Sequence, residues 1–128
     1  MSMGEKVPLE GVITGDLYGF ITDVNDAIIK MYGAADKNRF VGKHVVEFLV
    51  ERDRERAVRD SLNILTSGQS KTCEYRALTS SGEEVPIEVT ITLIRDENGE
   101  QIGFVDVVRN ISNRKKNGKE LKKKEKGT

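Results

Sequence analysis

The chain has 128 residues, a length that suits one domain, and its 21 basic and 21 acidic side chains leave no net charge to favour nucleic acid or a membrane surface. Its one cysteine, Cys73, excludes an internal disulfide and a cysteine-ligated zinc site. No apolar run is long enough to span a bilayer or to serve as an export signal, so we expect a soluble cytoplasmic protein without membrane contact.

The first part of the chain predicts a hairpin followed by helices. The β-rich runs GVIT and GFIT flank GDLY, in which Gly15 and Asp16 supply a turn. Asn25 is a typical amino-terminal cap, and the helix that it begins should end at Gly33. The polar stretch AADKNRF predicts one turn, and GKHVVEFLV predicts a short helix, where we expect His44 at a solvated surface position.

The longest helical signal covers residues 51–68. Val58, Leu62 and Leu65 recur at helical spacing and predict the buried face of this helix. Gly68 suits the left-handed position that ends a helix. The solvated side is expected to carry the charged residues Arg54, Glu55, Arg59 and Asp60.

Three strands are predicted in the second half, at residues 70–78, 84–94 and 101–110. In the first of them, Cys73 and Tyr75 alternate with charged residues and should face inward. In the second, Val89 and Ile91 belong to the apolar side of a regular alternation. Five short strands around a central group of helices are typical of an α+β fold. We therefore predict a five-stranded antiparallel sheet with short helices packed on one face.

Charge is unevenly distributed along the chain. Residues 111–128 carry eight basic and two acidic side chains, whereas the remainder carries 13 basic and 19 acidic ones. The tail after Asn113 contains one large apolar residue, Leu121, so it should not fold alone. Its lysines could neutralise phosphates, but it has no aromatic residue to stack on bases. We favour a solvated linker over a nucleic-acid-binding segment.

Four segments occur in the order and spacing of a known family. GDLYGFITDVNDAIIKMYG is similar to the opening turn, strand and Asn-capped helix of that family, and VGKHVVEFL to its Gly-Lys helix. LTSGQSKTCEYRALTSSGEEVPIEVT is similar to the end of its long helix and the next two strands, and VVRNISNRKK to its closing signature. Across residues 9–116 the sequence therefore resembles a PAS domain.

The resemblance implies three parts and a sensory function. Residues 1–8 would be an extension, 9–112 a PAS sensor domain, and 113–128 a basic linker helix toward an effector domain. We expect the non-catalytic sensor part of a prokaryotic histidine kinase in a two-component system, acting as a homodimer. A ligand-free PAS scaffold for dimerisation and spacing is the alternative, followed by a basic-tailed nucleic-acid-binding domain.

The closing signature would relay the signal to the effector. In this chain Asn110 and Ser112 replace the Asp and Thr that are usual in the family, so an ion pair there would become at most a neutral hydrogen bond. The relay residues implied by the resemblance are Arg109, Asn110, Ile111 and Ser112.

The residues that hold cofactors in some PAS domains are missing here. Haem-binding members use a histidine on the long helix, but residues 51–68 contain none, and Ala57 or Val58 stands at the approximate equivalent. Flavin photosensors place a reactive cysteine shortly after the Gly-Lys pair, where this chain has Val45. We therefore expect neither haem nor flavin, and the identity of any cofactor stays open.

The resemblance places a ligand site in a cavity between the sheet and the helices. A small organic acid or an empty pocket would fit this composition, and the alternative is that the inward side chains simply fill the core. Among them, the hydroxyl of Tyr75 would need a hydrogen-bond partner, and Cys73 is expected to pack as a small apolar residue. The cavity candidates are Ile21, Ile28, Met31, Phe48, Val58, Leu62, Cys73, Tyr75, Val89, Ile91 and Val105.

Overall fold

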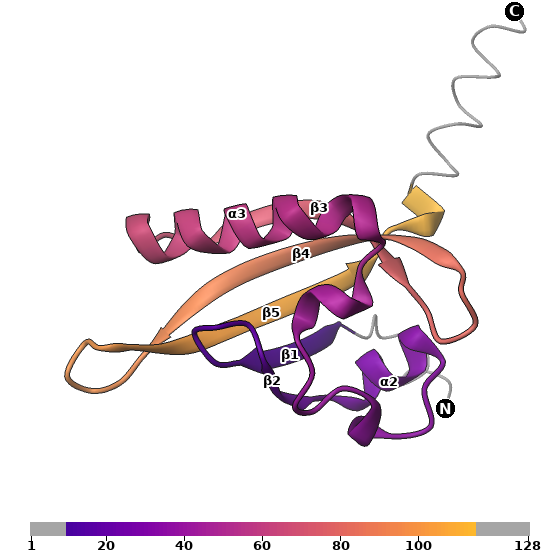
Figure 1. Ribbon diagram of the computed structural model, residues 1–128, viewed down its shortest axis with the longest axis horizontal. Coiled ribbons are helices and arrows are strands. Elements are labelled where there is room, and N and C mark those ends of the chain that lie inside the picture. Colours follow the sequence, from indigo (N-terminus) through magenta and orange to yellow (C-terminus); the bar gives the residue numbers. More distant parts are fainter. Residues whose placement is uncertain (1–9, 115–128) are drawn as a thin grey trace, which may run out of the picture.

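The computed structural model describes residues 10–114, which form a five-stranded antiparallel sheet with helices on one face (Figure 1). The α+β fold predicted from the sequence is confirmed. Along the sheet the strands lie in the order β2-β1-β5-β4-β3. The strands are β1 (Gly11–Gly15), β2 (Ile21–Val24), β3 (Lys71–Leu78), β4 (Glu84–Arg95) and β5 (Gln101–Asn110). The helices are α2 (Asp26–Tyr32), α3 (Glu51–Ser67) and two 3₁₀ turns, η1 (Lys37–Arg39) and η2 (Val45–Phe48).

Strand β5 lies at the centre of the sheet and joins its two halves. It pairs with β1 on one side and with β4 on the other, so Ile13 and Ile91 both lie opposite Asp106. Strand β2 pairs with β1 at one edge of the sheet, and β3 pairs with β4 at the other edge. The last strand of the domain therefore holds the first hairpin against the third and fourth strands.

The sequence determines the ends of α2 through its cap residues. The Oδ1 atom of Asn25 accepts hydrogen bonds from the backbone N–H of Ile28 at 3.2 Å and of Val12 at 3.0 Å. Gly33 ends the helix with φ near 68°, a left-handed conformation that glycine adopts without a Cβ clash. The predicted helix is confirmed, and its cap also fastens it to β1.

The buried face of α3 differs from the predicted one. Ala57, Asp60 and Ile64 are buried, whereas Val58 and Leu62 remain 43% and 56% exposed. Asp60, expected in solvent, is 7% exposed because it pairs with polar groups of β3. The helix is thus rotated toward β3, and the apolar spacing of Val58 and Leu62 marks the wall of a cavity instead of the core.

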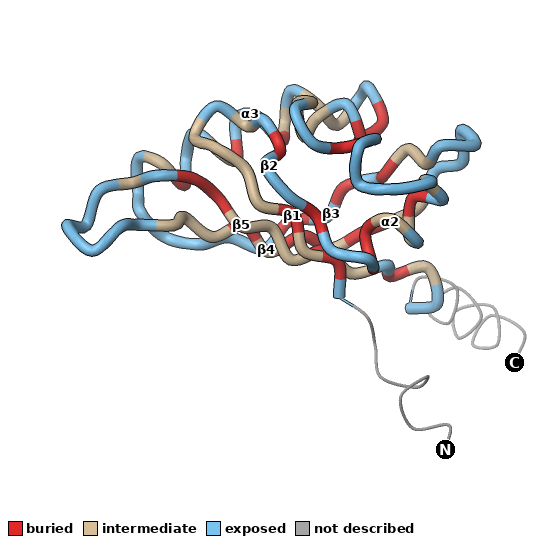
Figure 2. The backbone as a smooth tube through the Cα atoms, turned by 90° about the horizontal axis from the view of Figure 1, so that it is seen from below, coloured by how far each residue is buried: buried red, intermediate tan, exposed pale blue. Residues whose placement is uncertain are grey.

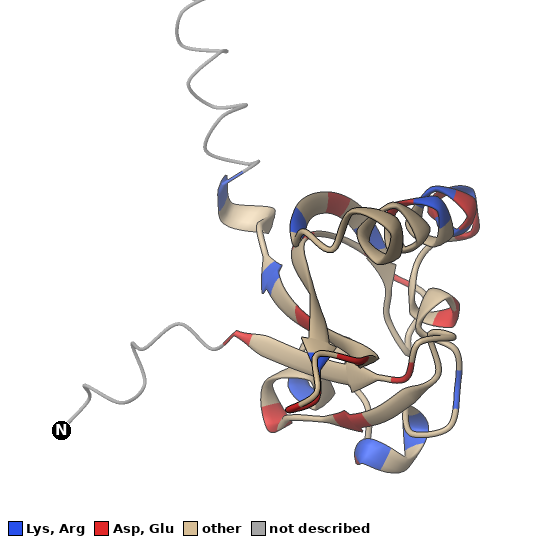
Figure 3. Ribbon diagram, turned by 90° about the vertical axis from the view of Figure 1, so that its left-hand side faces the viewer, with Lys and Arg blue, Asp and Glu red and all other residues tan. Residues whose placement is uncertain are grey.

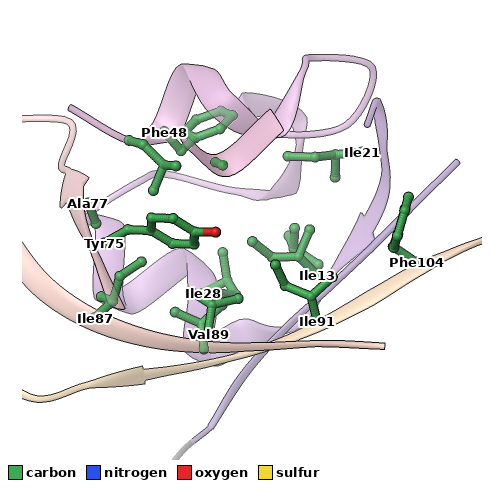
Figure 4. Packing of buried hydrophobic residues seen from close by; sticks show 14 of the residues in the cluster. Ile13, Ile21, Ile28, Phe48, Tyr75, Ala77, Ile87, Val89, Ile91 and Phe104 are labelled. Carbon is green, nitrogen blue, oxygen red and sulfur yellow. The ribbon is translucent and has the colours of Figure 1, made fainter. Parts of the chain in front are cut away.

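The core lies between the sheet and the helices. In Figure 4, Ile87, Val89 and Ile91 of β4 lie on the side of the sheet that faces Phe48 of η2. The buried Tyr32 hydroxyl donates a hydrogen bond to the carbonyl oxygen of Phe48 at 3.2 Å, which satisfies its polar group inside the core. The exposed positions gather in the connecting turns and on the outer sides of the elements (Figure 2).

Two predicted segments lie largely outside the described part of the chain. The extension at residues 1–8 lies wholly outside it, and of the linker helix predicted at 113–128 the structure describes only 113–114, which are helical. Within residues 10–114, no helix has the length and apolar character needed to cross a membrane.

Gly103 provides a test of the contact between β5 and β1. A Cβ added there would collide with the backbone carbonyl oxygen of Gly15, which cannot swing away as a side chain could. We expect Gly103→Ala to lower the free energy of unfolding by roughly 1–3 kcal/mol, the usual cost of overpacking. Urea denaturation would measure the change. Ile102→Ala, at an exposed neighbouring position, is the control and should cost less; an equal loss would contradict the account.

A candidate ligand cavity between the sheet and α3

A largely apolar cavity of about 530 Å³ lies beside α3. Its walls come from β1, β2 and β5, from the turn between β1 and β2, and from η2 and α3. Ile13 of β1, Ile21 of β2 and Phe104 of β5 line it from the sheet, and all three are labelled in Figure 4. The lining residues are Ile13, Gly15, Asp16, Leu17, Tyr18, Gly19, Ile21, His44, Val45, Val46, Ala57, Val58, Ser61, Leu62, Leu65, Gln101, Phe104 and Asp106.

The structure separates the cavity candidates predicted from the sequence into groups. Ile21, Val58 and Leu62 line the cavity, and Met31 packs against the edge of the core. Val105 lies on the opposite face of β5, because Phe104 and Asp106 line the cavity and neighbouring strand residues alternate; its expected inward position was wrong. The remaining candidates are buried in the core beyond the cavity: Ile28, Phe48, Cys73, Tyr75, Val89 and Ile91.

Asp106 is the acidic group of β5 in this cavity; the other polar residue of β5 there, Gln101, donates its side-chain N–H to the carbonyl oxygen of Leu65 at 3.2 Å. The residue is half-buried, but its Oδ1 atom is sealed from solvent and has no hydrogen-bond partner among the described residues. Its neighbours across the sheet, Ile13 and Ile91, are apolar. Burial raises the pKa of the Asp106 carboxyl to about 7, because a low-dielectric site disfavours the charged form.

His44 and Asp16 shape the opposite wall. The Oδ1 atom of Asp16 accepts the backbone N–H groups of Tyr18 and Phe20 at 2.9 and 3.0 Å. The Nε2 atom of His44 donates to the carbonyl oxygen of Tyr18 at 2.8 Å, and its Nδ1 accepts from the N–H of Val46 at 3.3 Å. His44 is therefore a half-buried cap of η2 that holds the β1–β2 turn, which corrects its expected solvated position.

The charge of the lining opposes one expectation from the sequence. Asp16 and Asp106 are both acidic, and no Lys or Arg lines the cavity in the described part of the chain. An organic acid would therefore meet carboxylates without a cation to balance its charge, so this ligand class does not suit the cavity.

A second polar group lies under α3, outside the cavity. The Tyr75 hydroxyl donates to Oδ2 of Asp60 at 2.6 Å, and the Lys71 ammonium binds Oδ1 at 2.9 Å. Burial acts to raise the pKa of Asp60, but the hydrogen bonds from Tyr75 and Lys71 outweigh it and keep the pKa below its ordinary value. Burial raises the pKa of the Cys73 thiol, so this residue is held as a thiol inside the core.

The predicted relay residues meet where β5 ends beside β4. Arg109 contacts Glu10 at 2.6 Å and Glu88 at 3.3 Å, and Arg114 contacts the other oxygen of Glu88 at 3.2 Å. Charged residues of both signs also lie along α3 (Figure 3). Exposed ion pairs stabilise a fold only slightly. The role of these ion pairs is therefore to connect the start of the described chain, strand β4 and the residues at and after the end of β5.

Backbone contacts fix the same region more firmly. The side-chain oxygen of Asn110 accepts the N–H of Ser112 at 2.8 Å. Ile111 is buried, and its N–H donates to the carbonyl oxygen of Pro86 at 3.0 Å. We call residues 109–114 the junction.

Comparison with known proteins identifies the family. A family model described as PAS domain matches residues 9–113, and the chain therefore belongs to the PAS domain family. No curated protein matches the sequence significantly. Three solved structures support the assignment of the fold.

The first is the PAS domain of a protein from Colwellia psychrerythraea, with 27% identity, a TM-score of 0.75, and coverage of 81% of this chain and 87% of that one. The second is the PAS domain of an HTR-like protein from Haloarcula marismortui, with 23% identity, a TM-score of 0.65, and coverage of 86% and 87%. The third is the N-terminal domain of a diguanylate cyclase with PAS/PAC sensor from Marinobacter aquaeolei, with 19% identity, a TM-score of 0.70, and coverage of 83% and 98%. PAS domains are in general non-catalytic sensory modules.

Sequence reasoning missed Asp106 as a cavity residue. The signal that could have found it is an acidic residue on the apolar side of a strand, between Phe104 and Val108 in the alternation. Within residues 10–114, no group of three or more His, Cys, Asp and Glu side chains is placed to hold a metal ion.

The raised pKa of Asp106 predicts how stability depends on pH. Between the ordinary carboxyl pKa of 3.8 and about 7, the folded state binds more protons than the unfolded chain, so stability falls as pH rises through this window. Replacing the carboxyl by a neutral amide removes this loss. We expect Asp106→Asn to stabilise the protein by roughly 2–4 kcal/mol at pH 8 and to change it little near pH 4.

Urea denaturation at the two pH values measures this difference. Glu97→Gln removes one negative charge from an exposed turn and serves as the control, with no pH-dependent gain expected. An equal effect of Asp106→Asn at both pH values would show that the carboxyl does not titrate as described.

Proposed function

We propose that this chain is the sensory module of a larger signalling protein, binding a small organic ligand in the cavity and relaying the change through the junction. One observation carries the proposal: β5 supplies Phe104 and Asp106 to the cavity and continues directly into Arg109 and the junction. A shift of β5 at the cavity therefore has a short, rigid path to the segment that follows the domain.

The proposed relay requires two arrangements of the junction. A ligand can shift their balance only if it binds one arrangement better than the other. The ion pairs of Glu88 with Arg109 and Arg114 are weak enough to exchange, while the buried Ile111 anchors the junction to β4. Signal transfer would then consist of a change in how residues 112–114 leave the sheet.

The proposed effector is a histidine kinase, as the resemblance to the family implies, and the proposed working state is a homodimer. Among the similar structures, a diguanylate cyclase with PAS/PAC sensor is another kind of signalling enzyme. The module itself is proposed to have no catalytic activity, because the polar groups of the cavity bind backbone atoms or stand alone.

A ligand-free dimerisation scaffold is the second candidate. It is favoured by the apolar mouth of the cavity, where Tyr18 and Leu62 are 81% and 56% exposed and could pack against a second copy. Sedimentation velocity at increasing concentration would reveal such a dimer. If Leu62→Glu abolished the dimer while no small molecule ever occupied the cavity, the scaffold role would replace the sensor role.

Filling the cavity tests the sensor function. Ser61 lines the cavity from α3, and Ser61→Phe should occupy part of its volume and exclude a ligand. We expect native mass spectrometry of the purified protein to show a non-covalent adduct that this variant reduces at least about tenfold, a loss of roughly 1.4 kcal/mol of binding.

Asn63→Phe places the same ring on the exposed side of α3 and should leave the adduct unchanged. An adduct that survives Ser61→Phe, or that both variants remove equally, would contradict binding in this cavity.

A further inference from the structure

The unpartnered Oδ1 atom of Asp106 is the feature of the cavity that the fold itself does not explain. Buried polar side chains in folded proteins are nearly always hydrogen-bonded, and one that is not calls for a partner. Here Oδ1 of Asp106 is sealed from solvent without a partner among the described residues, while the residue lines the cavity. Because the residue lines the cavity, a rotation of its side chain would present this oxygen to a donor on a bound molecule.

Within residues 10–114, no neighbouring element offers Asp106 a positive charge. The β1 and β4 residues opposite it are Ile13 and Ile91. From α2, the Tyr32 hydroxyl is already committed to the carbonyl oxygen of Phe48.

The remaining titratable groups of the cavity do not supply a cation either. Both ring nitrogens of His44 are engaged with backbone groups, and Asp16 adds a second carboxylate. The α3 wall contributes apolar side chains and the Ser61 hydroxyl. The field inside the cavity is therefore negative, and a positive ligand would be favoured there over a negative one.

The rest of the lining indicates that the body of such a ligand would be apolar. Ile13, Leu17, Val46 and Phe104 present apolar surface, and a volume of about 530 Å³ accommodates a small organic molecule. A ligand with an apolar body would cover this surface while one polar end reached Asp106.

We propose that the cavity takes a small organic amine, whose ammonium group donates a hydrogen bond to Asp106 while its apolar body fills the remaining space. This inference rests on the proposed sensor function and adds the chemical class of the ligand. The ammonium would pair with the carboxylate, and the desolvation of both charges would be offset by a charge-assisted hydrogen bond in a site of low dielectric.

Three compounds with one apolar body and different polar ends test the proposal: 2-cyclohexylethylamine, 2-cyclohexylethanol and cyclohexylacetate. Each would be titrated into the ¹⁵N-labelled protein, with the amide resonances of Ser61 and Phe104 reporting on the cavity. We expect the amine to bind at least about tenfold more tightly than the alcohol, since a hydrogen bond to a charged group exceeds a neutral one by this order. The carboxylate should bind most weakly.

Substitution of Asp106 shows whether this residue causes the preference for the amine over the alcohol. In Asp106→Asn the amine should lose its advantage and bind within about threefold of the alcohol, because the charge-assisted bond is gone. Glu97→Gln, which removes a negative charge from an exposed turn, should keep the full preference.

A second readout uses the protein without substitution. Saturation with the amine should lower the pKa of the Asp106 carboxyl, followed by ¹³C resonance, by at least about one unit, because a nearby cation favours the charged form. The alcohol should not lower it.

The outcomes separate this inference from the function on which it rests. Equal binding of the three compounds in the cavity, or strongest binding of the carboxylate, would overturn the amine proposal and leave the ligand-sensing function standing. Failure of all three to shift the cavity resonances at millimolar concentration would count against both. An amine preference that persists in Asp106→Asn would assign recognition to another residue and overturn the role given to Asp106.

Discussion

The arrangement of this domain depends on β5 being hydrogen-bonded along both of its edges. The strand pairs with β1 over Gly11–Gly15 and with β4 over most of its length, so it cannot move without disturbing both halves of the sheet. The lack of a side chain at Gly103 lets β1 approach closely, and the buried Ile111 fixes the far end to β4. The last strand of the domain therefore holds the two halves of the sheet together.

This central position gives β5 one face of functional interest and one exit. On the helix side it contributes Phe104 and Asp106 to a cavity that α3 leaves unfilled, because α3 is docked toward β3 through the Asp60–Tyr75 hydrogen bond. At its end it passes into the junction, where Arg109 and Arg114 share Glu88. Ionisation of Asp106, or a ligand in the cavity, would therefore act on the same strand that leads into the junction.

Local patterns in the sequence predicted the elements well and the site only in part. The Asn25 cap, the Gly33 stop and the alternation around Tyr75 are decided by neighbouring residues, so they could be read directly. The rotation of α3 could not, because it depends on the pairing of Asp60 with a residue 15 positions later. Val58 and Leu62 line the cavity, although their burial was overestimated. Asp106 lies between Phe104 and Val108 in the alternation, but it was overlooked because Val105 and Val107 make the other face of the strand apolar as well.

The coupling of the cavity to the junction through β5 is the central claim, and the titration of Asp106 provides a way to observe it directly. The amide resonances of Ile111 and Ser112 would be followed by NMR from about pH 5 to pH 9 in the wild type and in Asp106→Asn. If the two sites are coupled, these resonances shift with a midpoint near the Asp106 pKa of about 7, and the shift disappears in the variant. Junction resonances that do not respond, or that respond identically in the variant, would contradict the account.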